Sequence, residues 1–386
     1  MKISDIRRYH ANAIFHRIRI EPQTSQRDIV RKTGFDKSTV SSIVNRFDEL
    51  GLIVRSSKAA GNRPGRPTEG LAISPDSGLL IGVQVEADEL IFVAAGLDGA
   101  PLVHQRQPFD GEVEGLETQV ARGIEAVIGE GLRETPILGV GVSLPGLVRH
   151  DGSLVHAPIL GWHDVPVLER LQSTISAPLY VGNDGKAAAM AERMFGSCVD
   201  IDDFVYLFSG SGVGGALFLR GEMYLGADGL AGELGHLKVV PQGRLCSCGA
   251  SGCLSAYLSE RAIAAHASQV SGRPVHSIDA ILERAGQDDP AVLDAFALAG
   301  DVLGTALSNL INTFNPPIVV LGGDMARAEA YLRPTLDPSL RRQTHPSMFA
   351  RSQVTFSEIS AVKPYLGGIA LALDGVTGLE SSSVLP

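Results

Sequence analysis

Three of the four cysteines of this 386-residue chain lie within eight residues, and a histidine precedes them by ten. Three thiolates and one imidazole form the closed tetrahedral donor set of a structural zinc site, and the intervening glycines let the chain fold around an ion. The alternative is a group of reduced thiols, because disulfides are disfavoured in the cytoplasm. The fourth cysteine, Cys198, is expected to be a small buried hydrophobe. The spacing favours zinc bound by His236, Cys246, Cys248 and Cys253.

Asn183 and Asp184 follow the apolar residues 178–181 after a single glycine. A carboxylate beside a carboxamide suits the recognition of sugar hydroxyls, because Asp accepts hydroxyl protons while Asn both donates and accepts. In a kinase, Asp184 would instead act as the general base on a hydroxyl. The structural alternative is a helix N-cap. Glu233 and His236 are three residues apart, so in a helix they would share a face and could converge on one ligand.

These residues follow segments that have the pattern of an α/β sheet. Short apolar runs predict strands, and each run ends in glycine and polar residues, which is where α/β sheets build ligand sites. The predicted strands cover residues 79–85, 90–95, 137–142, 178–181, 204–208 and 318–321. Helices are predicted at 113–132 and 186–194, and a glycine loop at 209–215.

The first seventy residues have the pattern of a winged helix-turn-helix. Apolar residues at helical spacing predict a first helix that ends before Pro22. Ser25 and Asp28 form the signature of a capping box for a second helix, and Asp36 can cap a third after a short turn. The third helix has an apolar stripe over residues 40–50 and is followed by two strand-like segments that predict a wing.

The polar face of the third helix has small or hydrogen-bonding side chains and no acids, which suits base edges and phosphates. We predict DNA contacts from Lys37, Ser38, Thr39, Ser41, Ser42, Asn45 and Arg46. The wing contains Asn-Arg-Pro-Gly-Arg-Pro at 62–67, a stiff ribbon whose Arg63 and Arg66 would fit a narrow minor groove. The alternatives are a surface helical hairpin and a semi-rigid linker.

Charge is divided unevenly along the chain. Residues 1–68 have 14 basic and 6 acidic residues, a net charge of +8. The remainder has 19 basic and 37 acidic residues, a net charge of −18, so the overall −10 hides the asymmetry. This distribution indicates a basic module for a polyanion joined to an acidic body that does not itself bind nucleic acid.

Length and composition indicate a soluble protein of two or three domains, with 44% hydrophobic and 20% charged residues. The first fifteen residues contain no apolar core of a signal peptide. The longest uncharged stretch, residues 302–323, contains Ser, Asn and Pro residues that a lipid-facing helix would not tolerate. We therefore expect a cytoplasmic protein without a membrane span.

Taken together, these motifs resemble the ROK family, whose name joins repressors, open reading frames and sugar kinases. The matching strings are Gly-Val-Ser-Leu-Pro-Gly at 141–146, Gly-Asn-Asp at 182–184, a glycine-rich signature over 212–226, Glu-Leu-Gly-His at 233–236 and Cys-x-Cys-Gly-x-x-Gly-Cys at 246–253. Their order and spacing agree over about residues 79–324. The N-terminal module with its Gly-Arg-Pro wing resembles the repressor branch, that of the xylose and N-acetylglucosamine repressors.

The resemblance implies an α/β protein in which a winged helix-turn-helix at 1–75 precedes a two-lobed, actin-like ATPase fold. The first lobe would cover 79–184 with about 366–386, and the second 185–365, with the zinc element and an oligomerisation surface. Sugar would lie in the cleft between the lobes. By position, the resemblance assigns sugar hydroxyls to Asn183, Asp184, Glu233 and His236, and zinc to His236, Cys246, Cys248 and Cys253.

Two positions depart from the family pattern. ROK kinases begin their first hairpin with an Asp-x-Gly-Gly-Thr phosphate loop, whereas residues 84–88 of this chain read Gln-Val-Glu-Ala-Asp. Gln84 replaces the magnesium-binding Asp, and the carboxylate of Glu86 would repel phosphates. The family also places a sugar-binding Glu two residues after the last cysteine, where this chain has Ser255. The first departure argues against kinase activity, and the second leaves the identity of the sugar open.

We therefore expect a sugar-responsive transcriptional regulator, a repressor of carbohydrate-utilisation genes that is not an enzyme. A homodimer or homotetramer would present two recognition helices to successive major grooves of an operator. Sugar would favour one closure of the lobes and so change operator affinity, with release and promotion of DNA binding both open.

Two other functions are compatible with the sequence. One is an ATP-dependent sugar kinase with a DNA-binding appendage, in which Asp184 would be the general base. The other is control by a protein partner that captures the DNA-binding module, so that sugar is sensed indirectly. Turnover of a sugar with ATP would favour the first, and operator binding that ignores every small sugar would favour the second.

Overall fold

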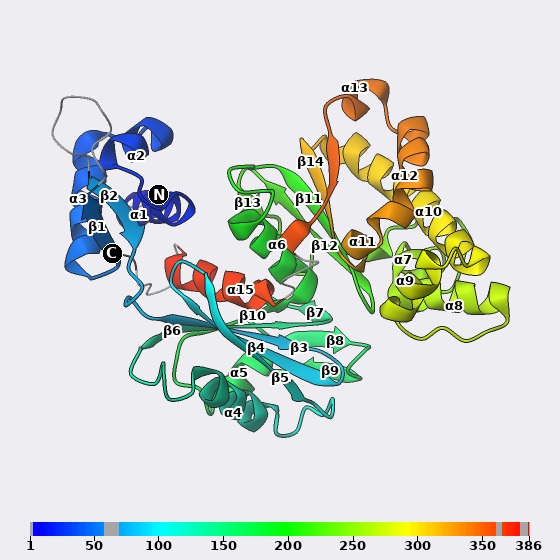
Figure 1. Ribbon diagram of the computed structural model, residues 1–386, viewed down its shortest axis with the longest axis horizontal. Coiled ribbons are helices and arrows are strands. Elements are labelled where there is room, and N and C mark those ends of the chain that lie inside the picture. Colours follow the sequence, from blue (N-terminus) through cyan, green and yellow to red (C-terminus); the bar gives the residue numbers. More distant parts are fainter. Residues whose placement is uncertain (1–2, 58–68, 360–364, 379–384, 386) are drawn as a thin grey trace. The chain divides into compact units, whose positions relative to one another are not determined.

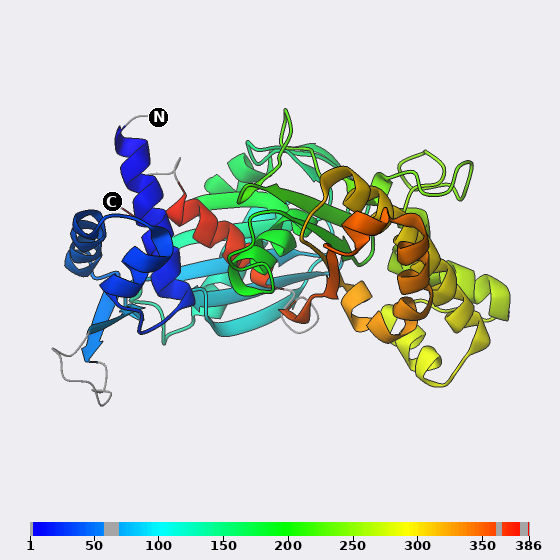
Figure 2. The ribbon, with the colours of Figure 1, turned by 90° about the horizontal axis from the view of Figure 1, so that it is seen from above.

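The computed structural model describes residues 3–57, 69–359, 365–378 and 385 (Figures 1 and 2). The chain forms two compact units. The first unit comprises Met1–Ser143, Val167–Val181 and Gly368–Pro386, and the second comprises Leu144–Pro166 and Gly182–Gly367. The sequence predicted three domains instead, and their boundaries remain a prediction. They are 1–75, 79–184 with about 366–386, and 185–365.

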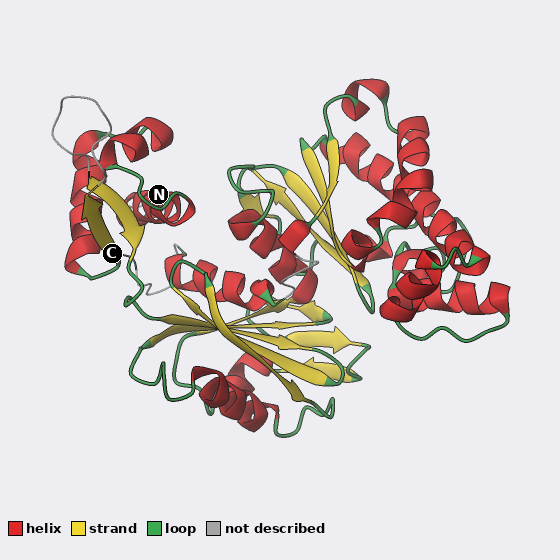
Figure 3. Ribbon diagram, in the orientation of Figure 1, coloured by secondary structure: helices red, strands yellow, loops and turns green. Residues whose placement is uncertain are grey.

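The first unit begins with three helices and a two-stranded sheet, which are coloured by type in Figure 3. They are α1 (Ile3–Ile20), α2 (Gln26–Thr33), α3 (Lys37–Glu49), β1 (Ile53–Ser57) and β2 (Glu69–Ile73). Ser25 caps α2 by accepting the N–H of Asp28, and Asp36 caps α3 by accepting the N–H of Thr39 at 2.9 Å. Both predicted caps are thus confirmed.

Apolar side chains from all three helices hold this small domain together. The Phe15 and Phe47 rings meet edge to face with centroids 6.3 Å apart, and both side chains are fully buried. The apolar stripe predicted on α3 is the buried face of that helix. Strands β1 and β2 pair antiparallel, as expected of a wing. The predicted minor-groove residues Arg63 and Arg66 lie outside the described residues.

The rest of the first unit is a five-stranded sheet in the order β10-β6-β3-β4-β5. Its strands are β3 (Leu79–Val85), β4 (Glu89–Gly96), β5 (Pro101–Pro108), β6 (Ile137–Leu144) and β10 (Leu179–Asn183). Helices α4 (Leu116–Ile128) and α5 (Val167–Gln172) lie on one side, and α15 (Leu366–Thr377) packs on the other (Figure 1). The approach of α15 requires glycine, because a Cβ on Gly141 would lie 2.0 Å from the carbonyl oxygen of Gly368.

Helix α15 also contacts α1, although the two are far apart in the sequence. The Asn12 side chain donates from Nδ2 to the carbonyl oxygen of Thr377 at 2.8 Å. His16 Nε2 lies 3.4 Å from the Thr377 hydroxyl, which itself donates to the carbonyl of Leu373. The N-terminal helix α1 is therefore hydrogen-bonded to α15.

The second unit contains a five-stranded sheet in the order β13-β12-β11-β14-β15 and a three-stranded sheet in the order β7-β8-β9. The larger sheet comprises β11 (Phe204–Ser209), β12 (Val213–Leu219), β13 (Glu222–Met223), β14 (Ile318–Gly323) and β15 (Gln353–Phe356). The smaller comprises β7 (Leu147–Val148), β8 (Leu154–Ala157) and β9 (Trp162–Val165). All six strands predicted from the sequence are present across the two units.

Alternating residues of β11 enter the two cores of this unit. Phe204 and Tyr206 pack on one side with Cys198, which is buried as predicted, and with α6 (Asp184–Phe195). Val205 and Leu207 pack on the other side against the helical layer. That layer comprises α7 (Ser255–Leu258), α8 (Glu260–Ser271), α9 (Ile278–Gly286), α10 (Pro290–Phe314), α11 (Asp324–Arg327), α12 (Glu329–Gln343) and α13 (Pro346–Phe349).

Two structural details qualify the expectations from the sequence. The predicted glycine loop at 209–215 is shorter than expected, because β12 begins at Val213 and pairs with β11. This tight hairpin requires Gly215, where a Cβ would lie 2.6 Å from the carbonyl oxygen of Tyr206. Helix α10 is long and apolar enough to cross a membrane by length and composition alone, but 67% of its most apolar window is buried inside the protein, as in a core helix.

Candidate functional site

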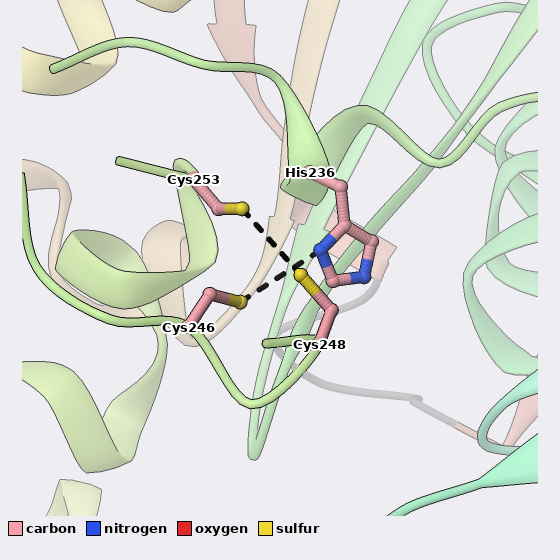
Figure 4. Close-up of side chains that lie close together, drawn as sticks. All are labelled: His236, Cys246, Cys248 and Cys253. Carbon is pink, nitrogen blue, oxygen red and sulfur yellow. Dashed lines mark hydrogen bonds between the residues drawn. The ribbon is translucent and has the colours of Figure 1, made fainter. Parts of the chain in front are cut away.

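The four predicted metal ligands converge in the second unit. The donor atoms of His236, Cys246, Cys248 and Cys253 all lie within 4.8 Å of one another (Figure 4). Cys248 Sγ is 3.7 Å from Cys253 Sγ, and Cys246 Sγ is 3.8 Å from His236 Nδ1. Ligand atoms bound to one zinc ion at usual distances would lie about 3.5–3.8 Å apart at the corners of a tetrahedron. The donor set and its spacing therefore fit a tetrahedral metal ion.

Local turns fold the cysteine segment around this point. The N–H of Gly249 donates to the carbonyl of Cys246 at 2.9 Å, and the N–H of Cys246 donates to the carbonyl of Ala250 at 2.8 Å. Gly252 has a φ of +79°, and a Cβ there would lie 2.0 Å from the carbonyl oxygen of Val240. The glycines between the cysteines thus permit the close turn that the sequence predicted.

The surroundings favour the ligating forms of His236 and Cys248 and oppose that of Cys253. Burial lowers the pKa of His236, which keeps its imidazole neutral. A hydrogen bond from the backbone N–H of Ala250 lowers the pKa of the Cys248 thiol, whereas burial raises the pKa of Cys253. Lys238 Nζ donates to Cys253 Sγ at 2.7 Å, an interaction that stabilises a thiolate. Lys238 was not singled out from the sequence, because its contact depends on the fold of the loop.

Asn183 has the capping role that was its structural alternative. Its Oδ1 accepts the N–H of Lys186 at 3.0 Å at the start of α6, and its Nδ2 donates to the Gly146 carbonyl and to Asp184 Oδ1, both at 2.9 Å. Asp184 Oδ1 also accepts the N–H of Gly185 at 2.7 Å. Both of these hydrogen bonds to Asp184 use Oδ1, and neither occupies Oδ2.

Burial raises the pKa of Asp184 to about 6, and the neighbouring Glu233 carboxylate adds to the shift. Burial also raises the pKa of Glu233, which Lys186 partly opposes. Two carboxylates are therefore held close together with little solvent, an arrangement that suits hydrogen bonds from hydroxyl groups.

Lys186 is a residue of this site that the sequence reasoning missed. Its side chain is 7% exposed, and its ammonium donates to the carbonyl oxygen of Gly229, in the loop that leads to Glu233. Burial lowers the pKa of Lys186, and the carboxylate of Glu233 opposes that shift. The signal was a lysine in the first turn of a predicted helix directly after Asn183 and Asp184, but only the structure shows that it points inward.

All four predicted sugar-binding residues line one pocket of about 780 Å³ that lies within the second unit. His236 reaches it from a short 3-10 helix (Leu234–His236), with Nδ1 turned toward the sulfur atoms and Nε2 turned away from them (Figure 4). The two predicted roles of His236 would therefore require different ring nitrogens. Ser255 also lines the pocket, with side chains that the sequence reasoning did not select, namely His156, Arg244, Arg261 and His266.

Seven of the nine predicted DNA-contacting residues, those between Lys37 and Arg46, lie on one helix of the first unit, α3. Their side chains are exposed for Lys37, Ser38, Ser42, Asn45 and Arg46, and half-buried for Thr39 and Ser41. Ser38 and Thr39 donate their hydroxyls to the carboxylate of Asp36.

Two further polar residues of α3 also make contacts on the protein surface. Arg46 pairs with Glu49 at 3.0 Å, and Asn45 Oδ1 accepts from Arg55 at 3.1 Å. The exposed Arg27 of α2 is a basic residue that the sequence reasoning did not select, although a helix that crosses the DNA backbone commonly provides such cations.

Comparisons with known proteins agree with this architecture. The profile described as the ROK family matches residues 80–374, and that described as the MarR family matches residues 4–63. A putative xylose repressor of Caldicellulosiruptor sp. (strain Rt8B.4) is 28% identical over 316 residues, covering 77% of this chain and 78% of that protein.

Two solved structures extend the comparison. A ROK family transcriptional regulator, a homolog of the E. coli MLC protein, superposes with a TM-score of 0.81 at 24% identity, covering 96% of both chains. A ROK family glucokinase from Streptomyces griseus, in complex with glucose and AMPPNP, has a TM-score of 0.68 at 25% identity, covering 77% of this chain and 100% of that one. The predicted fold class, a winged helix domain followed by an actin-like kinase fold, is confirmed.

Proposed function

This chain belongs to the ROK family, and from that premise we propose that it is a sugar-responsive, DNA-binding repressor of carbohydrate-utilisation genes. The observation that carries the proposal is the presence of both parts in one chain. The first unit contains a winged helix-turn-helix with a polar, exposed recognition face, and the second contains a pocket with paired carboxylates. Sugar-dependent operator binding requires both.

In this proposal, sugar hydroxyls donate to Asp184 and Glu233, while Asn183 positions Asp184 and His236 offers Nε2. Asp184 Oδ2 is the atom that the two hydrogen bonds to Oδ1 leave unused, and the buried Lys186 balances part of the negative charge. Sugar can alter DNA binding only through a difference in its affinity for the two states of the repressor, and the coupling is reciprocal.

Operator DNA would be bound by α3, with Lys37, Ser41, Ser42 and Asn45 reading bases and Arg46 contacting phosphate. Ser38 and Thr39 would add backbone contacts near the Asp36 cap, and Arg63 and Arg66 of the wing would enter a minor groove. A homodimer or homotetramer in the cytoplasm would place two such helices on successive major grooves.

The metal site is proposed to hold a structural zinc ion. His236, Cys246, Cys248 and Cys253 supply a full set of four protein ligands, and a closed set leaves no position for a substrate. When bound, zinc would hold its four ligands in a fixed tetrahedral arrangement and would not be a reaction centre. His236 belongs to this ligand set and also lines the pocket, so the ligand set would help to position the pocket wall.

We expect no kinase activity from this chain. The stretch that the resemblance aligns with the phosphate loop ends β3 and turns into β4, where the Gln84 amide donates to the Glu86 carboxylate and the N–H of Glu86 donates to the carbonyl of Glu89 at 2.9 Å. Neither a magnesium-binding Asp nor a glycine pair stands there. The kinase alternative is supported by Asp184 and by the likeness to the glucokinase structure.

The test is fluorescence anisotropy of the full chain on DNA from upstream of its own and neighbouring genes, at fixed salt with competitor DNA and a panel of pentoses, hexoses and amino sugars. One sugar is expected to shift specific binding. Asp184→Asn is expected to abolish that shift and leave sugar-free operator affinity unchanged, because Asp184 lies in the pocket and not on α3.

Matched controls make the result decisive. Asp151→Asn changes an exposed acid in the same unit outside the pocket and should behave as the wild type. Loss of operator binding in Asp184→Asn would contradict the division of roles. Sugar-dependent release of ADP from ATP that Asp184→Asn abolishes would establish the kinase alternative, and specific binding that ignores every sugar would favour control by a protein partner.

A further inference from the structure

Charged side chains of both signs line the pocket of the second unit. Its acidic residues, Asp184 and Glu233, lie at the start of α6 and beside the short 3-10 helix. Its guanidinium groups, Arg244 and Arg261, come from the cysteine loop and from the first turn of α8. The carboxylates suit neutral hydroxyls, whereas Arg presents a planar fork of donors that matches carboxylate and phosphate groups.

Arg244 is held in place by three contacts. Its guanidinium lies over the ring of the buried Tyr257, 4.9 Å from the centroid, and its backbone N–H donates to the Tyr257 hydroxyl at 2.8 Å. Arg244 Nη2 lies 2.5 Å from His266 Nδ1, and His266 Nε2 lies 2.7 Å from Asp294 Oδ2. With Nε2–H donating to Asp294, Nδ1 is the acceptor for the guanidinium. The cation is therefore oriented in advance.

Arg261 provides a second cation without a competing acid. Its side chain is exposed, and it has no ion-pair partner in the part of the chain that the structure describes. Five of the eleven other described arginines of this unit, Arg284 and Arg327 among them, are paired with aspartates. An unpaired guanidinium in a pocket is available to a ligand anion.

Position 255 also makes the pocket less acidic than the family pattern implies. The family resemblance places a glutamate there as a sugar contact, and this chain has the uncharged, half-buried Ser255. The pocket is thus lined by two carboxylates and two guanidinium groups, with no third acid to compete for the cations.

From these observations we propose that the effector is a sugar that carries an anionic group, with its hydroxyls on the carboxylates and its anion on Arg244 and Arg261. This inference rests on the proposed function, since it assumes a sugar effector. The shared chemistry is a phosphate or carboxylate oxygen accepting from guanidinium N–H groups, and a phosphosugar and a sugar acid are its two sources.

The experiment is isothermal titration calorimetry of the full chain with matched sugars: glucose, glucose 6-phosphate and glucuronate, then N-acetylglucosamine and its 6-phosphate, with inorganic phosphate alone as a reference. An anionic sugar is expected to bind about tenfold or more tightly than its neutral parent. Whether phosphate or carboxylate gives the gain separates the two sources.

Two variants assign the preference to the named residues. Arg261→Gln, at an exposed position where folding is not at risk, and Arg244→Gln should each reduce the preference for the anionic sugar to about threefold or less. Arg273→Gln removes an exposed guanidinium outside the pocket and should change nothing. Equal affinity for neutral and anionic sugars in the wild type, no binding of either, or a preference that survives both variants would overturn the inference.

Operator anisotropy with the same sugars separates this inference from the proposed function. A neutral sugar that alone shifts operator binding through Asp184 would leave the proposed function intact and reject the anionic effector. Specific operator binding that no sugar of either kind changes would reject the proposed function itself.

Discussion

The polar side chains of α3 and those of the pocket differ in where their partners lie along the chain. On α3, Arg46 pairs with Glu49 and Thr39 with Asp36, each three residues away and exposed to solvent. In the second unit, Asn183 reaches Gly146 and Lys186 reaches Gly229, partners 37 and 43 residues away. The α3 surface relies mainly on short-range contacts, whereas the pocket also depends on contacts between distant segments.

This difference fits the two proposed tasks. Exposed ion pairs contribute about 0–1 kcal/mol each, so DNA phosphates can replace them at little cost. The buried contacts of the pocket keep carboxylates and amides in place before any ligand arrives, which reduces the cost of binding. Four changes should separate the two surfaces, from the largest expected effect to the smallest.

Loss of the metal site should affect the pocket most strongly. Cys253→Ser removes a buried ligand, so we expect zinc to fall well below one per chain, sugar affinity to fall by about 100-fold and Tm to fall by roughly 10 °C. Metal analysis of reductant-treated protein, calorimetry and thermal unfolding would measure these changes.

The matched control is Cys198→Ala, which removes a buried thiol outside the cluster and should retain zinc and sugar binding. Operator affinity of Cys253→Ser below its Tm should equal that of the wild type. A full zinc complement in Cys253→Ser would contradict the assigned ligand set.

Lys186→Met should weaken sugar binding by about tenfold, because it removes the hydrogen bond to Gly229 and the cation beside Glu233. The control Arg193→Met removes a cation from the same helix that pairs with Asp202 outside the pocket. Calorimetry with the effector measures both. Equal losses in the two variants would indicate a general effect on α6 instead of a role for Lys186.

Arg46→Gln should weaken operator binding by about fivefold and reduce the salt slope by about 1, as expected for one phosphate contact. Glu49→Gln should act in the opposite direction and tighten binding by about twofold, because it frees Arg46 from its pair. Arg122→Gln, on α4, is the charge-matched control. Anisotropy titrations over a range of salt concentrations measure all three, and no change in Arg46→Gln would remove that residue from the interface.

The pH dependence of sugar binding should be the smallest effect. Burial raises the pKa of Asp184 to about 6, so lowering the pH from 7.5 to 5.5 protonates most of this carboxylate and removes an acceptor for hydroxyls. Affinity for a neutral sugar should therefore fall by about fourfold as the pH falls. Calorimetry at both values tests this, and Asp184→Asn should show a smaller dependence. Tighter binding at pH 5.5 would contradict the role of the ionised form.

The contrast between local and distant partners also explains what the sequence could predict. The caps at Ser25 and Asp36, the strands and the clustering of the His and Cys side chains depend on residue types at short spacing, so they were predictable. The inward direction of Lys186 and the support of Arg244 by His266 depend on contacts between distant elements. Sequence periodicity does not encode such contacts. The length of the β11–β12 hairpin likewise depends on the close approach of Gly215 to the backbone of Tyr206.

The hydrogen bond from Asn12 to Thr377 joins residues 365 positions apart. On a ribosome, which adds about 5–20 residues per second, the three N-terminal helices emerge long before α15 exists. A nascent chain can therefore fold its DNA-binding domain early, but α1 gains this attachment only after residue 377 has left the exit tunnel. A message cut short before α15 would encode the three N-terminal helices without that anchor.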